Sequence, residues 1–319
     1  MFFKNLMKWL IMITIVISIS SKNWFIFWIM MEMNMMMFIP ILKQNKLQNC
    51  NSMITYFIVQ SFSSIMFFMF SMMTITNFSV FNETLIVISL MIKLAMIPFH
   101  SWLILISETL DYNSLMIILS MQKVIPLFIL SKMKTELSFI FSMISLIFSS
   151  IMIFNLKFLK KILIFSSISH MSWMIIIMNF MSNFWMTYMF IYFFMILMLT
   201  KFLLKSNVFL IYDLMKLKMT NSNKIGIIVS LLSLGGVPPF IGFVIKFLAI
   251  NIIIKYSIIS MMILITSSLL NIFIYIRMIT PILLTFNNIT INFNLFKIIK
   301  NFIFYSVIII TLILMNLIF

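Results

Sequence analysis

The chain has 319 residues, of which 64% are hydrophobic and 9% are charged, and its formal net charge is +16. Soluble domains carry roughly 25% charged residues, so this chain has too few charged side chains to cover a water-facing surface. A polypeptide in lipid must form helices or a closed barrel. Apolar runs of about 20 residues fit spanning helices rather than the roughly 10-residue strands of a barrel. The composition therefore predicts an all-α, multi-pass membrane protein.

Apolar runs bounded by Lys, Asn and Ser predict about eleven transmembrane helices. In chain order, the expected spans are 6–21, 23–42, 53–75, 84–107, 112–131, 136–155, 160–180, 184–205, 225–251, 256–278 and 298–319. The first run superficially resembles a signal peptide, but it has no small-residue cleavage site, so we interpret it as the first span. With no long linker, residues 1–319 are predicted to form a single polytopic transmembrane domain.

The basic residues support this topology. The N-terminus and the even-numbered loops hold fifteen of the 22 basic residues, and the opposite side holds four. Basic loops stay on the side from which insertion occurs. We therefore expect the N-terminus on the matrix (or cytoplasmic) side and the C-terminus on the opposite side. One missed or extra helix would move later loops to the other side and remove this difference in basic residues between the two sides.

Cysteine, histidine and charge patterns exclude several kinds of protein. The single cysteine, Cys50, excludes an intrachain disulfide framework and any site with several cysteine ligands, such as an iron–sulfur cluster. Nothing beside His100 and His170 indicates a haem, so we expect no redox cofactor bound directly. The basic residues stand in short loops rather than in one patch interleaved with aromatic residues. We therefore expect no nucleic-acid partner.

Four charged residues stand in the middle of apolar runs, namely Glu32, Lys93, Lys123 and Lys246. A charge at bilayer depth costs about 2.5–3.5 kcal/mol. Four of them cost on the order of 10 kcal/mol, comparable with the net stability of a typical domain. Such residues usually face the bundle interior and mark an ion path. The alternative is snorkelling to the interface, which is most open for Lys246 and least for the short side chain of Glu32.

Glu32 and Lys93 suggest a way to couple protonation to movement. Desolvation disfavours the charged form of a buried lysine, and a nearby carboxylate favours it. Our hypothesis is that movement of Glu32 relative to Lys93 would load or release a proton.

Prolines stand beside two of these lysines. Pro98 lies five residues after Lys93 and leaves the carbonyl of Leu94 without its helical partner, because proline has no N–H. Pro126 likewise frees the carbonyl of Gln122. A packing kink is the simpler interpretation of any one such proline.

A stronger helix break precedes Lys246. The ninth span is predicted to be interrupted by Gly235, Gly236, Pro238 and Pro239. Interrupted helices occur at membrane depth where the backbone lines a wet cavity. Two interrupted spans, each with a buried lysine, therefore favour an ion translocator with inverted repeats and discontinuous helices.

His170 lies near the middle of the seventh span, in KKILIFSSISHMSWM. Its titration range suits proton transfer, and the four serines around it could order water. An interhelical hydrogen bond is the alternative. His100 follows Pro98 near a helix end, where a direct role is less favoured.

Five motifs carry a family resemblance. The segments KLAMIPFHSW, MQKVIPLFIL, FSSISHMSWM and LLSLGGVPPFIGFVIKFLAI resemble, in that order, the NADH–ubiquinone oxidoreductase chain 2 family, and WIMMEMNMMMFIPIL resembles its Glu-bearing second helix. This family supplies an antiporter-like membrane-arm subunit of mitochondrial respiratory complex I. The resemblance covers about 24–275, which implies an antiporter-like core at 23–278 followed by the C-terminal helix 298–319.

The resemblance implies a role for each buried group. Glu32 and Lys93 would form the charged pair of the first half-channel, and Lys123 would be the central relay. His170 would lie on the central axis, and Lys246 would serve the exit half-channel.

The resemblance also implies a setting. The chain would lie in the mitochondrial inner membrane among other membrane-arm subunits and inner-membrane lipids, cardiolipin among them, with its C-terminus toward the intermembrane space. NADH, FMN, the iron–sulfur clusters and ubiquinone would belong to other subunits.

The sequence departs from the family pattern in places, and one departure leaves no assigned role for a carboxylate in the loop around Glu108. Ile104 and Leu105 stand where the family usually has Pro-Glu, and Glu108 stands where some relatives carry another acid. Ser101 replaces an aromatic residue and Ile245 replaces a proline, which packing should tolerate.

Two other functions stay open. A free-standing cation/proton antiporter shares the broken helices and buried lysines, although the organelle-like composition argues against it. A purely structural subunit would have little reason to retain four buried charges.

Overall fold

A computed structural model describes residues 2–43, 48–74, 79–133, 135–180, 183–206, 208–214 and 221–284. These residues are helical apart from turns, short connections and an isolated antiparallel bridge between Phe158 and Leu210. By length and composition, eight helices in this part of the chain could cross a membrane. The predicted span 298–319, and with it the C-terminal side, lies outside the described residues.

Seven of the predicted spans are single uninterrupted helices. They are α1 (Phe2–Ser20), α2 (Trp24–Leu42), α3 (Gln48–Met73), α8 (Glu136–Ile153), α9 (Leu159–Asn179), α10 (Phe184–Ser206) and α13 (Ile258–Leu284). Their bounds follow the apolar runs, and α13 continues six residues past its predicted end at 278. Pro40 and Pro281 lie inside α2 and α13, each close to the C-terminal end.

Three predicted spans are divided into two helices. The pairs are α4 (Ser79–Leu94) with α5 (Ser101–Ser107), α6 (Tyr112–Leu119) with α7 (Met121–Lys132), and α11 (Asn221–Gly235) with α12 (Ile241–Ile253). A short 3-10 helix, η2 (Tyr212–Leu214), precedes α11. The breaks in the first and third pairs coincide with the Pro and Gly residues that predicted them.

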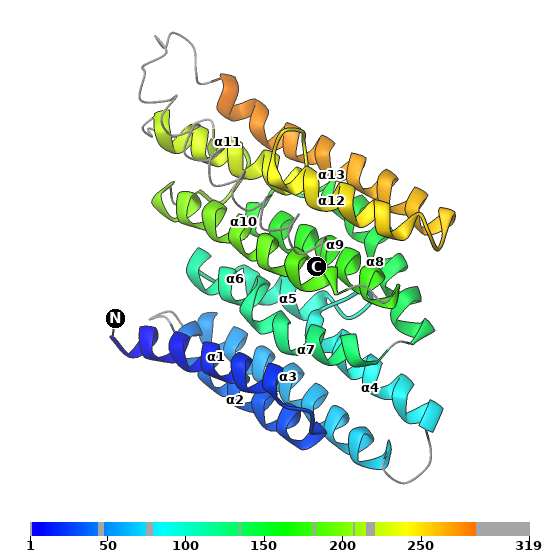
Figure 1. Ribbon diagram of the computed structural model, residues 1–319. Helices are drawn as coiled ribbons and strands as arrows, with labels where there is room; N and C mark the ends of the chain where they lie inside the picture. Colours follow the sequence, from blue (N-terminus) through cyan, green and yellow to red (C-terminus); the bar gives the residue numbers. More distant parts are fainter. Residues whose placement is uncertain are drawn as a thin grey trace.

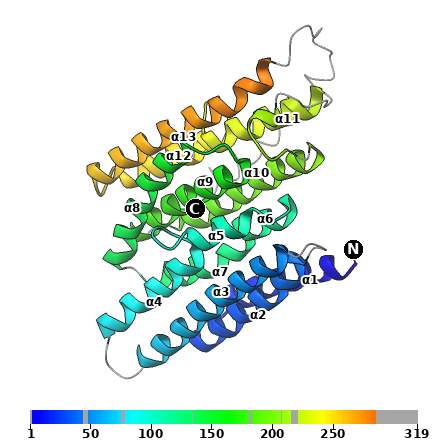
Figure 2. The ribbon, with the colours of Figure 1, turned by 180° about the vertical axis from the view of Figure 1, so that it is seen from behind.

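The helices lie side by side in one slanted bundle, with α1–α3 at one edge and α11–α13 at the other (Figures 1 and 2). The spans α4–α5 and α11–α12 are the fourth and the ninth along the chain, so the chain traverses them in opposite directions. This is the arrangement that an inverted repeat produces.

Helix α9 forms the centre of the bundle. All of its residues from Leu159 to Met178 are buried except Lys161, and it packs against α5, α6, α7, α8, α10 and α12. A helix that is buried on every side can be apolar all round. The serines and His170 on α9 are therefore interior groups, where each polar atom needs a partner.

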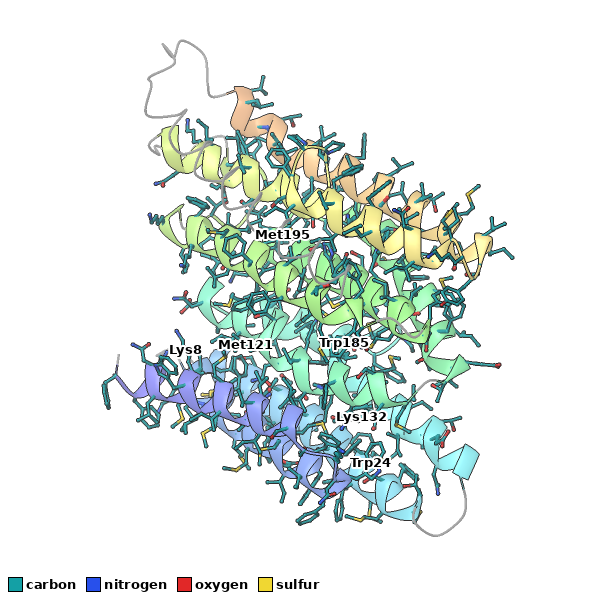
Figure 3. The ribbon with its side chains drawn as sticks, viewed as in Figure 1. Lys8, Trp24, Met121, Lys132, Trp185 and Met195 are labelled. Carbon is teal, nitrogen blue, oxygen red and sulfur yellow. The ribbon has the colours of Figure 1, made fainter. Side chains whose placement is uncertain are left out.

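Lys132 fastens the turn between α1 and α2 to the end of α7. Its ammonium donates to the backbone carbonyl of Ser21 at 3.1 Å and lies 4.2 Å from the centre of the Phe27 ring. Figure 3 shows Lys132 beside Trp24, whereas Lys8 lies at the opposite end of α1. The turn of the first hairpin is thus held to a span more than a hundred residues away.

Arg277 on α13 holds the C-terminal end of α8. Its guanidinium donates to the carbonyls of Ile153, Phe154 and Leu156. Hydrogen bonds to charged groups contribute about 1.5–3 kcal/mol each. We expect Arg277→Met to lower the unfolding temperature in mild detergent by several degrees. Arg277→Lys keeps the charge but loses the planar guanidinium with its several donors, so its unfolding temperature should lie between those of Arg277→Met and the unmodified protein. Equal unfolding temperatures for all three proteins would contradict this role.

Candidate functional site

Glu32 and Lys93 approach each other without touching. Glu32, on α2, accepts a hydrogen bond from the hydroxyl of Ser64 on α3. It lies within electrostatic range of Lys93 on α4. The ion pair found within 4 Å between described side chains joins Lys161 and Glu108 instead. The charged pair implied by the resemblance is therefore a pair at a distance, with Ser64 as the direct partner of the carboxylate.

Lys93 lies in the last turn of α4, next to the helix break. The helix ends at Leu94, and Ala95 has a φ of 57° in the left-handed region. The indole N–H of Trp102 donates to the carbonyl of Ile92 at 3.1 Å, so α5 folds back on the end of α4. A cation is favourable at a helix C-terminus, where carbonyl groups lack partners.

Lys93 and Lys123 border one small internal cavity. Its volume is about 10 Å³, which is close to the room that one water molecule needs. Polar side chains from α3 and α7 also line it, namely Tyr56, Gln60 and Gln122. We name this space the inner cavity.

Hydrogen bonds hold the polar wall of the inner cavity in place. The hydroxyl of Tyr56 donates to the side-chain oxygen of Gln122 at 3.2 Å. The amide nitrogen of Gln122 donates to the side-chain oxygen of Asn34 on α2 at 3.0 Å. These contacts tie α2, α3 and α7 together at the depth of the two lysines.

Lys123 reaches from α7 to the central helix. Its ammonium donates to the hydroxyl of Ser167 on α9 at 3.0 Å. The break in this span lies at Ser120, with φ −122° and ψ −78°, whereas Pro126 lies inside α7. The break at Ser120 was not predicted from the sequence. Pro126 does not end α7, and its missing N–H leaves the carbonyl of Gln122 without its helical partner.

His170 lies one turn beyond Ser167 on α9. Its Nδ1 is 2.9 Å from the hydroxyl of Tyr188 on α10, and its ring centre is 4.9 Å from that of Tyr192. It lies within electrostatic range of both Lys123 and Lys246. The expected interhelical hydrogen bond is present, and the imidazole also interacts electrostatically with both lysines.

Lys246, on α12, points back into the break between α11 and α12. Its ammonium donates to the carbonyl of Gly235 at 2.8 Å. Gly236 has a φ of +81°, and a Cβ there would meet Cδ of Lys246 at 3.0 Å. Glycine is needed at Gly236 both for this backbone conformation and for the close approach of the lysine.

Snorkelling does not describe these lysines. Lys93, Lys123 and Lys246 are 7%, 3% and 6% exposed. Lys123 donates to a hydroxyl and Lys246 to a backbone carbonyl, whereas Lys93 borders the inner cavity. His100 lies apart from the inner cavity, with its ring centre 5.6 Å from that of Phe165.

Sequence reasoning missed several neutral partners of the charged groups. Ser64, Gln60 and Gln122 stand inside apolar runs and could have been noticed as polar residues out of place. Tyr188 and Tyr192 gave no such signal, because tyrosine is common in membrane helices and its partner is chosen by packing between helices.

Residues 21–271 match the transmembrane family of NADH:quinone oxidoreductases and Mrp antiporters. The NADH-ubiquinone oxidoreductase chain 2 of Rhipicephalus sanguineus is 45% identical over 300 residues, which cover 90% of this chain and 95% of that relative. The chain belongs to the NADH-ubiquinone oxidoreductase chain 2 family. Within this chain 2 family, the Anopheles gambiae protein is 34% identical over 250 residues, covering 74% of this chain and 72% of its own.

Solved structures show that the chain 2 fold extends beyond close relatives. A chain of respiratory complex I from Thermus thermophilus, solved with bound aureothin, is similar with a TM-score of 0.82 at 16% identity, covering 88% of this chain and 71% of that one. A chain of the Mrp complex from Dietzia sp. DQ12-45-1b has a TM-score of 0.76 at 13% identity, covering 86% and 59%. The predicted all-α, antiporter-like membrane fold and the family resemblance are confirmed.

Proposed function

We propose that this chain is a proton-translocating membrane-arm subunit of NADH:ubiquinone oxidoreductase. Its relatives carry that enzyme's name, and the relatives are animal proteins, which supports a place in the mitochondrial inner membrane. NADH oxidation by quinone takes place on other subunits, which hold the NADH site, FMN, the iron–sulfur clusters and ubiquinone. The loop charges support an N-terminus in the matrix and a C-terminus toward the intermembrane space.

The proton path runs through Glu32, Lys93, Lys123, His170 and Lys246. The observation that carries this proposal is the inner cavity, because Lys93 and Lys123 share it. A single water between two amines can pass a proton without either side chain travelling far. Lys123 then contacts α9 through Ser167, and His170 on the same helix is within electrostatic range of both Lys123 and Lys246.

Two features of the proposed path would allow its groups to gain and lose protons in turn. Glu32 can move relative to Lys93 because its direct partner is the hydroxyl of Ser64 rather than the ammonium. Each lysine also lies at a helix break, where the carbonyls of Ile92 and Gly235 are already engaged by side chains. A small shift of one half-helix would therefore change the surroundings of the lysine.

A free-standing cation/proton antiporter is the alternative, favoured by the likeness to a chain of an Mrp complex. Native separation of mild-detergent membranes, with peptides of this chain tracked against NADH-dehydrogenase activity, separates the two. Co-migration at very high mass supports the proposed subunit. Migration away from that activity, with sodium-dependent proton exchange, supports the antiporter.

Replacing Lys93 by Met tests the path itself. We expect loss of proton-coupled quinone reductase activity with assembly preserved, because Met keeps the volume and removes the titrating group. The control is Lys255→Met, an exposed lysine between α12 and α13, which should leave coupling unchanged. A purely structural subunit would tolerate both changes, so normal coupling in Lys93→Met would refute the path.

A further inference from the structure

A second cavity of about 280 Å³ lies at the end of the bundle assigned to the matrix side. It is formed by the end of α5, the start of α9 and the segment before η2. Its lining residues are Ser107, Glu108, Phe158, Lys160, Lys161 and Phe209. We name this space the outer cavity, and no residue of the path described above lines it.

The outer cavity holds an ion pair at its mouth. Glu108 accepts from Lys161 at 2.7 Å, and their side chains are 60% and 22% exposed. Lys160 is buried and donates to the backbone carbonyls of Glu108 and Leu110. Asp213, the acidic residue of η2, instead accepts from the backbone N–H of Leu210. Among the described residues, Lys161 is therefore the charged partner of the Glu108 carboxylate, and Lys160 holds the backbone beside it.

The short helix α5 separates the outer cavity from the inner one. Leu103 lines the inner cavity and Ser107 lines the outer cavity. The two residues are four apart, so they share one face of α5 and lie about 6 Å apart along its axis. Ile106 fills the intervening turn and is fully buried. A turn of apolar helix thus lies between the two cavities.

Helix α5 is a separate short segment, bounded by the break at 95–100 and the turn at 108–111. The indole N–H of Trp102 joins it to the end of α4, and α5 packs against α3 and α9. Its outer end is held by the ion pair of Glu108 with Lys161 and by Lys160, which donates to the carbonyls of Glu108 and Leu110. An apolar constriction of this kind can open and close a water path by wetting and drying.

We infer that the outer cavity is the matrix entrance for protons, with Glu108 as the collecting group and α5 as the gate. A proton from the matrix binds the Glu108 carboxylate and neutralises it. The neutral carboxyl holds Lys161 less strongly than the carboxylate does, which weakens one of the two lysine contacts at the end of α5 and lets this end shift. Water then continues past Leu103, and the proton passes from the carboxyl through water to the inner cavity. This inference rests on the proposed function, since it supplies the start of that path.

The test uses inside-out inner-membrane vesicles that contain the assembled complex, with the matrix side facing the medium. Glu108→Gln keeps the shape and removes the proton acceptor. We expect NADH-driven proton uptake to fall several-fold in dilute buffer and to recover as a small mobile buffer is added, because the buffer delivers protons directly to the cavity. Glu136→Gln, an exposed acid at the opposite end of the bundle, should behave as the unmodified protein.

Two results would refute the proposal that the outer cavity is the proton entrance. One is unchanged uptake in Glu108→Gln at every buffer concentration. The other is a loss that added buffer does not restore, which would indicate that the ion pair only stabilises the fold. Lys123→Met in the same vesicles separates this inference from the proposed function, because normal pumping in that variant would refute the path as a whole.

Discussion

Replacing Lys123 by Met is expected to stop proton pumping while the complex still assembles. Among the described residues, Lys123 is the one lysine that both borders the inner cavity and contacts the central helix α9. Met removes a charge from bilayer depth, so folding should not suffer. Ser167 keeps a hydrogen bond to the carbonyl of Ile164 at 2.6 Å, so no buried hydroxyl is left without a partner.

The expected loss in coupled turnover is at least about 10²-fold, the lower end of what a positioned acid–base group contributes. Native electrophoresis should show an intact complex, and a pH-indicating dye in sealed vesicles should show no proton uptake.

A second substitution separates charge from proton transfer at this position. Lys123→Arg keeps a cation, but a guanidinium does not release its proton in proteins. If Lys123 carries protons, both variants should be inactive. An active Lys123→Arg would mean that only the positive charge matters, and the relay would then have to bypass this residue.

Substitution of Gly242 by Ala is expected to prevent stable assembly. Gly242 opens the first turn of α12, and a Cβ there would overlap the backbone carbonyl oxygen of Ser233 on α11. Both helix backbones are rigid and cannot rotate out of contact as a side chain can, so α12 must move away from α11. Forced overpacking typically costs about 1–3 kcal/mol and occasionally more. Lys246 lies four residues further on the same face, so its bond to Gly235 should be lost as well.

The matched control is Gly226→Ala in α11. A Cβ at Gly226 would meet only the far edge of the Phe202 ring, which can move aside. We expect this variant to assemble, whereas Gly242→Ala should be depleted from the high-mass complex. Equal amounts of both in native gels would show that α11 and α12 can separate without consequence.

The sequence predicted the spans well because few backbone structures are possible in lipid. An apolar run long enough to cross the bilayer must be helical, and charges near the middle of a run must then lie deep, as Lys93 and Lys123 do. The glycines and prolines at 235–239 and Pro98 marked two of the breaks because their backbone chemistry cannot continue a helix.

Other features depend on contacts between helices and had no local signal. The break at Ser120 contains neither Gly nor Pro. Glu32 meets Ser64 and not Lys93, which is decided by how α2 packs on α3. Glu108 and Lys161 both stand near span ends and gave no sign of pairing. The burial of Lys93, Lys123 and Lys246 was therefore predictable from the sequence, whereas the partners of the charged groups were not.

Through its bond to Gly235, Lys246, a proton carrier in the proposed path, also caps a half-helix. As an ammonium, Lys246 offsets the partial negative charge at the end of α11. As a neutral amine it would leave that charge unopposed, and the two half-helices would lose an attraction across their break. Loss of a single proton would thus be converted into a mechanical signal, a loosening of the joint, that reaches both ends of the broken span at once.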